Sequence, residues 1–287
     1  MAKKKINSLF LNYLLENEKK LEKYGNWVEE LDISDRNKLV ELSIDVNERL
    51  VLLYACYGEI GWCLPEYLTK HIESHKIITD LENGVSIDAI DTKVADCFWE
   101  REVEAIALLT KRHLSASENS KLDIAFELYL KQKYFASAML LAGLIDSTSI
   151  NHFLKTNPTP ENVSQCWTCY GKIIQDNFGD KYFSSPFPYN KPAKNDERGK
   201  ATIEFFKSIK YDVAIDDKKE ILIPLSFALL KFFDNSDWQD KQNGIIPSSI
   251  NRHWLAHGMY DYDDITRADC MKLFFMLYQI VELYSML

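Results

Sequence analysis

Hydrophobic residues recur every three or four positions along much of this chain, which is the spacing of one face of an α-helix. The first such stretch covers residues 6–24 and is followed by Gly25, a residue suited to the position just past a helix. Two more stretches follow, over residues 39–54 and 87–113. We therefore predict amphipathic helices over these three segments.

A pair of helices is predicted next, over residues 122–130 and 134–154, with the polar residues 131–133 as the turn between them. The apolar face of residues 264–287 predicts a closing helix. Small residues in the second helix of the pair would let a neighbouring helix approach closely, namely Ala136, Ala138, Ala142 and Gly143. The pattern indicates a helix-hairpin core.

The segment between the pair and the closing helix is less regular. Prolines and aromatic residues over 180–199 predict a long surface loop. A weak alternation over 211–223 predicts a short hairpin, and Pro224 suits the first turn of the next helix. These features read as an insertion into a helical domain.

The fold class predicted from these patterns is all-α, a helical bundle. The polar residues 115–120 predict an internal boundary. This places a helical N-terminal region, with a sensing or regulatory role, at 1–115, and a second helical domain at 116–287 with an insertion at about 158–224.

Composition narrows the function classes. The net charge of −9 argues against a broad basic surface that binds duplex nucleic acid indiscriminately. The chain offers no run of roughly 20 apolar residues that would span a bilayer, and its first residues make a poor signal peptide. The six cysteines are thinly spread, which favours reduced thiols. We expect a cytoplasmic protein without a membrane partner.

The candidate chemistry lies in residues 251–258, Asn-Arg-His-Trp-Leu-Ala-His-Gly, which hold two of the six histidines and an arginine. Pro247 and the two serines after it predict a short helix over about 248–257, with Gly258 just past its end. Arg252 and His257 would then sit about 140° apart around that helix. They could flank one groove.

Metal-free RNA cleavage needs a base for the 2′-hydroxyl proton, an acid for the leaving 5′-oxygen, and a cation for the charge on the phosphoryl oxygens. His257 and Arg252 match these roles, with Asn251 and His253 positioning the phosphate or the pair. One copy holds a single well-placed histidine, so acid and base could be divided between two chains. This makes a homodimer mechanistically attractive.

Arg252, four intervening residues and His257, with polar His253 directly after the arginine, resemble the R-x4-6-H motif of HEPN domains. Residues 126–130 and 134–138 resemble the family's helix pair, and the resemblance covers about 122–287. It implies a metal-independent endoribonuclease of bacterial defence or toxin systems, with Arg252 and His257 as the catalytic pair of a homodimer. It also implies a supporting acidic residue, Asp146, with Glu127 as the alternative. RNA such as tRNA would be the substrate, and an antitoxin or defence-system protein a further partner, with no cofactor.

Basic and aromatic residues are interleaved over 187–210, and Lys194, Arg198 and Lys200 could guide single-stranded RNA. A solvated face is the alternative for this segment. For the cluster itself, the structural alternative is that Arg252 pairs with a nearby carboxylate while the histidines cap or pack. The carboxylates considered are Asp261, Asp263 and Asp264.

Three other interpretations stay open. His253 and His257, four residues apart, share the spacing of a zinc site but lack its general-base glutamate. Cys166 and Cys169 form a single CxxC without a second pair and read as core thiols. A helical module that binds RNA, a nucleotide or a protein without turnover is the non-catalytic rival.

Overall fold

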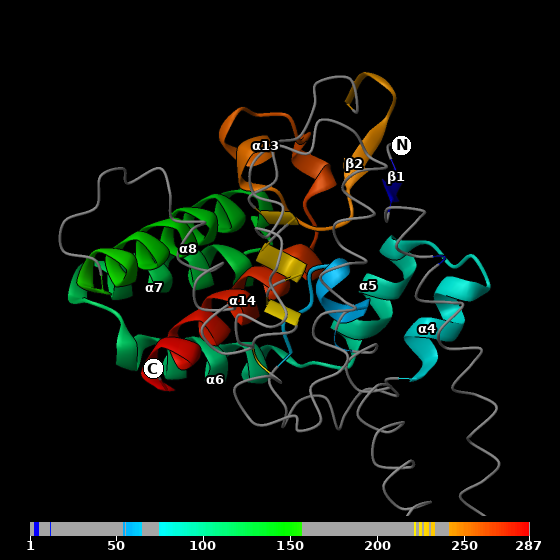
Figure 1. Ribbon diagram of the computed structural model, residues 1–287. Helices are drawn as coiled ribbons and strands as arrows, with labels where there is room; N and C mark the ends of the chain where they lie inside the picture. Colours follow the sequence, from blue (N-terminus) through cyan, green and yellow to red (C-terminus); the bar gives the residue numbers. More distant parts are fainter. Residues whose placement is uncertain are drawn as a thin grey trace, which may run out of the picture.

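In the computed structural model, the residues that the structure describes are mostly helical (Figure 1). Among the residues described, the single sheet consists of two three-residue strands, so the all-α prediction holds at the level of fold class. The described residues are 3–5, 12, 54, 56–64, 75–156, 221, 224–225, 227–229, 231–232 and 241–286.

The segment predicted as one helix over 87–113 consists of α5 (Ile87–Asp96), α6 (Glu100–Thr110) and the 3-10 helix η2 (Lys111–His113), preceded by α4 (His75–Glu82). The prediction of one helix was wrong. Phe98 lies between the two helices and is buried. The apolar residues therefore keep a helical spacing along the sequence, although the helix itself is interrupted. The carboxylate of Glu102 accepts a hydrogen bond from the Trp99 N–H and starts the second helix.

The helix pair is confirmed as α7 (Ala116–Leu130) and α8 (Tyr134–Thr156), which pack against each other. Gln132 in the turn has a φ of 58°, a left-handed conformation that reverses the chain within three residues. The polar stretch 115–120 is the cap and first turn of α7, because Ser115 and Glu118 form a reciprocal capping box.

The closing helix is α14 (Arg267–Met286), and it is the central element of the core. It packs against α8 and also against α5 and α6, as its position between these helices in Figure 1 shows. Residues 268–281 of α14 are buried on all sides, and a fully buried side chain such as Leu277 contributes about 1.5–3 kcal/mol. Helices on both sides of residue 115 therefore share one hydrophobic core, and the division into two domains stays a prediction.

A strand near the N-terminus was not predicted. The strand β1 (Lys3–Lys5) pairs in parallel with β2 (Ile245–Pro247), with Lys4 opposite Ile246. The strand β2 leads directly to residues 248–258, so the start of the chain is tied to the segment that carries the candidate site. In Figure 1 both strands lie at the same end of the molecule as the short helix of that segment.

Several sequence predictions fall mainly on residues outside the described part: the helices over 6–24 and 39–54, the CxxC pair, the loop over 180–199, the hairpin over 211–223, and Lys194, Arg198 and Lys200. Pro224 is helical, and so is Ile221, so this described residue of the segment predicted as a hairpin over 211–223 is not in a strand. None of the described helices is long and apolar enough to cross a membrane.

Candidate functional site

The candidate site is built on α13 (Arg252–Ala256), a helix shorter than the one predicted over 248–257. Asn251 is the N-cap, since its side-chain oxygen accepts a hydrogen bond of 3.0 Å from the Trp254 N–H. Ser248 instead donates its hydroxyl to the Glu59 carbonyl oxygen, at 2.9 Å, which keeps it out of the helix. Gly258, with a φ of 62°, ends the element as predicted.

Buried contacts hold α13 in place. Trp254 and Leu255 lie in the core. Asn251 is itself buried: its amide donates to the Lys231 carbonyl at 2.9 Å, and its backbone N–H donates to the Tyr260 hydroxyl at 3.0 Å. Asn251 therefore positions the helix and the residues on it, and its burial keeps it away from a phosphate on the surface.

The outward face of α13 carries Arg252, which forms an ion pair with Asp146 of α8, at 2.6 Å between Nη1 and Oδ1. The two side chains are 40% and 34% exposed, so the pair is open to solvent. Glu127, the other acidic residue considered, pairs with Lys131 on the surface of α7. The structure thus places Asp146, and not Glu127, against the arginine.

The structural alternative predicted that Arg252 pairs with a carboxylate such as Asp261, Asp263 or Asp264, and Arg252 does pair with a carboxylate, that of Asp146. Asp264 accepts a hydrogen bond from the Asp261 N–H, at 2.8 Å. Asp261 itself lies 3.8 Å from Lys241. The carboxylate on Arg252 comes from a residue 106 positions earlier in the chain.

His253 and His257 lie on the same face of α13, with their ring centroids 4.2 Å apart. Both residues are exposed. Partial burial, together with the neighbouring His257 and Arg252, lowers the pKa of His253 below its ordinary value. At neutral pH the His253 ring is therefore uncharged and able to accept a proton.

The site as described brings together one arginine, one carboxylate and two imidazoles at the protein surface. Within the described ranges, no three His, Cys, Asp or Glu side chains are grouped so that they could hold a metal ion. The groups present can exchange protons near neutral pH and can bind an anion.

A second feature escaped the sequence analysis. Trp99, at the break between α5 and α6, and Arg267, at the start of α14, line a pocket together. The signal available in the sequence was a tryptophan followed directly by Glu100 and Arg101, a polar context in which a large aromatic residue has no helix face to pack against.

The chain was compared with protein families, curated proteins and solved structures. No family model, no curated protein and no solved structure matches it.

Proposed function

We propose that this protein is a metal-independent endoribonuclease with a HEPN-like C-terminal domain, acting as a homodimer on RNA. The observation that supports the proposal is the grouping of Arg252, His253 and His257 on one capped helix, with Asp146 on the arginine. This arrangement supplies proton-transfer groups and a cation at one exposed place. Structured RNA such as tRNA, cut during stress or phage defence, is the substrate we propose.

His257 is the general base or acid of the proposed reaction. Arg252 neutralises the charge that grows on the phosphoryl oxygens as the 2′-oxygen attacks. Asp146 orients the guanidinium through the 2.6 Å ion pair. His253 stays uncharged near neutral pH because its pKa is lowered, so it leaves the local positive charge to Arg252.

The dimer follows from the need for both an acid and a base. Within one copy, His253 and His257 are in ring contact and share one position on the surface. Acid and base must reach opposite oxygens of the scissile phosphate, the 2′ and the 5′. A second copy of α13 facing the first would supply the other group.

The primary test is cleavage of RNA in the presence of EDTA by the His257→Ala and Arg252→Ala variants. We expect each to lose roughly 10²- to 10⁴-fold in rate, the range for a removed acid-base or charge-stabilising group. Exposed residues of the same types in η2 provide matched controls, and His113→Ala and Arg112→Ala should keep full activity. Thermal unfolding of all four variants would separate loss of chemistry from loss of fold.

The rival functions predict different outcomes. RNA that is bound but never cut would indicate the non-catalytic binding module. Full activity in either site variant would contradict the proposal. Stoichiometric zinc on His253 and His257, measured by elemental analysis, would indicate the metal-hydrolase alternative.

The dimer is tested by mixing wild-type protein with an excess of the inactive His257→Ala variant. If acid and base come from the α13 helices of two chains, mixed dimers hold only one of the two groups, and the excess variant suppresses the activity of the wild type. Activity that stays proportional to the amount of wild-type protein would show that each chain works alone.

A further inference from the structure

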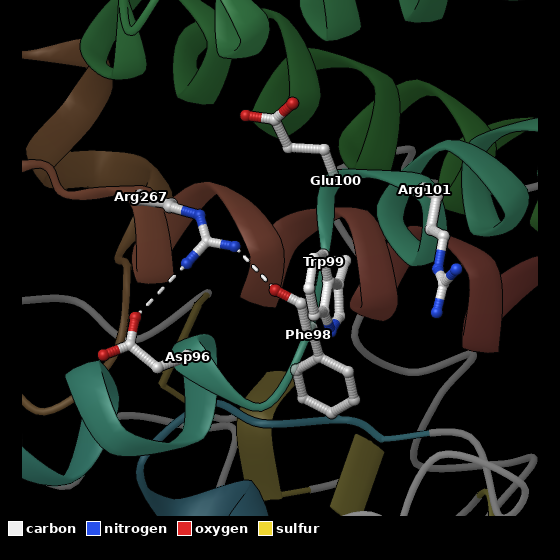
Figure 2. Close-up of a pocket in the computed structure, with 6 residues that line it drawn as sticks. All are labelled: Asp96, Phe98, Trp99, Glu100, Arg101 and Arg267. Carbon is white, nitrogen blue, oxygen red and sulfur yellow. Dashed lines mark hydrogen bonds and ion pairs between the residues drawn. The ribbon is translucent and has the colours of Figure 1, made fainter.

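The break between α5 and α6 opens a pocket of about 400 Å³ on the surface. Figure 2 shows its lining, which comes from the break itself and from the first residue of α14. The lining residues are Asp96, Phe98, Trp99, Glu100, Arg101 and Arg267.

Arg267 is a rigid wall of this pocket. Its Nη2 donates to the Phe98 carbonyl at 2.7 Å and its Nε donates to the Tyr129 hydroxyl at 3.2 Å. Asp96 lies 3.5 Å from its Nη1, as the dashed line in Figure 2 marks. The guanidinium is held in place by these contacts, and its side chain remains 30% exposed.

Trp99 also lines the pocket, but its ring lies outside the hydrophobic core. It is 69% exposed, whereas the neighbouring Phe98 is buried. The guanidinium carbon of Arg101 lies 5.5 Å from the centroid of the Trp99 ring. A large aromatic side chain left in water contributes little to the fold and offers a flat face to a ligand.

We propose that this pocket stacks a nucleobase of single-stranded RNA on Trp99, with Arg101 and Arg267 near the adjoining phosphate. Aromatic rings and guanidinium planes are the surfaces on which proteins hold unpaired bases. The Arg101 guanidinium already lies over the Trp99 ring, which argues against a second cationic side chain as the occupant. The two carboxylates, Asp96 and Glu100, balance the arginines, so the pocket as a whole is neutral and stacking carries the binding.

The inference rests on the proposed function, and α8 connects the surroundings of the pocket with the proposed cleavage site. Tyr134, the first residue of α8, lies close to Tyr129 and Arg267. Asp146, which holds Arg252, lies 12 residues further along the same helix, about 18 Å at the rise of an α-helix. A stacked strand advances about 3.4 Å per nucleotide. For a strand that runs along α8 from the pocket to Arg252, this length corresponds to roughly five nucleotides between the stacked base and the scissile bond.

The test measures the affinity of labelled 2′-O-methyl RNA strands from about three to about ten nucleotides long, a range that brackets common single-strand sites. These strands lack the attacking hydroxyl, so binding is observed without cleavage. We expect the wild-type affinity to rise once a strand exceeds about five nucleotides. Trp99→Ala should lose this gain, weakening long strands roughly 5- to 100-fold, while Trp99→Phe keeps most of it.

Leu108 provides the matched control, since it is an exposed apolar residue of α6 that does not line the pocket. Leu108→Ala should bind every strand as the wild type does. Equal affinity of Trp99→Ala and wild type at every length would overturn the inference, as would wild-type protein that binds no strand, or an arginine-rich peptide bound through Trp99 in place of RNA.

The inference and the proposed function fail separately. If cleavage depends on His257 but strand binding does not depend on Trp99, the proposed endoribonuclease function stands and the base pocket is wrong. If strand binding depends on Trp99 but the protein never cuts unmodified RNA, the base pocket stands and the proposed endoribonuclease function is wrong.

Discussion

Two groups of ion pairs in this molecule use similar side chains and differ in burial. One, which we call the buried cluster, consists of Lys4, Asp91, Asp269 and Lys272, whose side chains are at most 4% exposed. The other is the surface pair of Arg252 and Asp146, each more than one third exposed. The buried charges are closed to any ligand, whereas the surface charges can exchange partners.

The buried cluster connects three elements, β1, α5 and α14. The Lys4 ammonium lies 2.8 Å from Asp269 and 3.0 Å from Asp91, and Lys272 lies 2.6 Å from Asp91. The Trp62 ring N–H donates to the second oxygen of Asp91, at 3.0 Å. Two lysines balance two aspartates, so no net charge is buried by these four residues.

The pKa values in the cluster show how closely its charges depend on one another. Burial alone would raise the pKa of Asp269, but Lys4 and Lys272 hold it below its ordinary value. Burial lowers the pKa of Lys272, and Asp91 offsets this only in part. Lys4 holds its proton more firmly, since Asp269 and Asp91 raise its pKa despite burial. Such a cluster specifies how the N-terminal strand docks, while the surface pair leaves its charges available for chemistry.

The largest expected effect comes from removing Asp91. Asp91→Ala leaves Lys4 and Lys272 with Asp269 as their one buried carboxylate and removes the acceptor of the Trp62 ring N–H, and we expect a loss of about 3–5 kcal/mol in the free energy of unfolding. Denaturant unfolding would measure it. The matched control is Asp88→Ala, one turn earlier in α5: Asp88 also lies near Lys4, at 3.5 Å, but is 52% exposed. It should cost less than about 1 kcal/mol, and equal losses in the two variants would contradict the comparison.

Replacing Lys4 is the next largest change. Lys4→Met keeps the length of the side chain and leaves one excess negative charge in the core, at a cost of about 3 kcal/mol near neutral pH. In the wild type, the lowered pKa of Asp269 gives stability that is present above pH 3.8 and is lost as the pH falls further. In the variant, a buried carboxyl with a raised pKa takes up a proton on folding, so stability rises as the pH falls. Acid titration of both proteins should give slopes of opposite sign, and parallel slopes would count against a charge-balancing role for Lys4.

The helical fold followed well from the sequence where one apolar face continues without interruption. The helices α8 and α14 were found this way. The break at Phe98 was missed because its side chain keeps the spacing of core positions. Strand β1 was missed because Lys4 sits in a basic run that looks exposed, and its partners Asp91 and Asp269 are 87 and 265 positions away.

The candidate site was found because its parts are local. Arg252, His253 and His257 lie within six residues, and their density is visible in the sequence. The start of the helix was misplaced because Ser248 has a tertiary partner that no local rule reveals. The contact between Arg252 and Asp146 crosses 106 positions, and only the family resemblance pointed to that aspartate.

The surface pair should contribute little to stability. Its coupling in a double-mutant cycle of Arg252→Ala and Asp146→Ala, measured by denaturant unfolding, should be about 0–1 kcal/mol. If Asp146 orients the arginine for catalysis, Asp146→Asn should still slow RNA cleavage about 10- to 100-fold, the value of a hydrogen bond between charged groups. If the coupling energy of Arg252 and Asp146 equals the loss of stability in Asp91→Ala, the surface pair stabilises the fold as much as the buried cluster does. This outcome would contradict the comparison.

The smallest effect concerns His253 on the exposed face of α13. Because its pKa is lowered in the folded protein, the unfolded chain binds the proton more tightly. The stability linked to this ring is therefore fully present above pH 6.5, its ordinary pKa, and is lost as the pH falls below that value. We expect a shallow decrease in melting temperature between about pH 7 and pH 5 that His253→Gln abolishes and His113→Gln leaves in place. If the melting temperature of His253→Gln falls with pH as steeply as that of the wild type, another group takes up the proton. The idea that Arg252 and His257 keep the His253 ring uncharged would then be wrong.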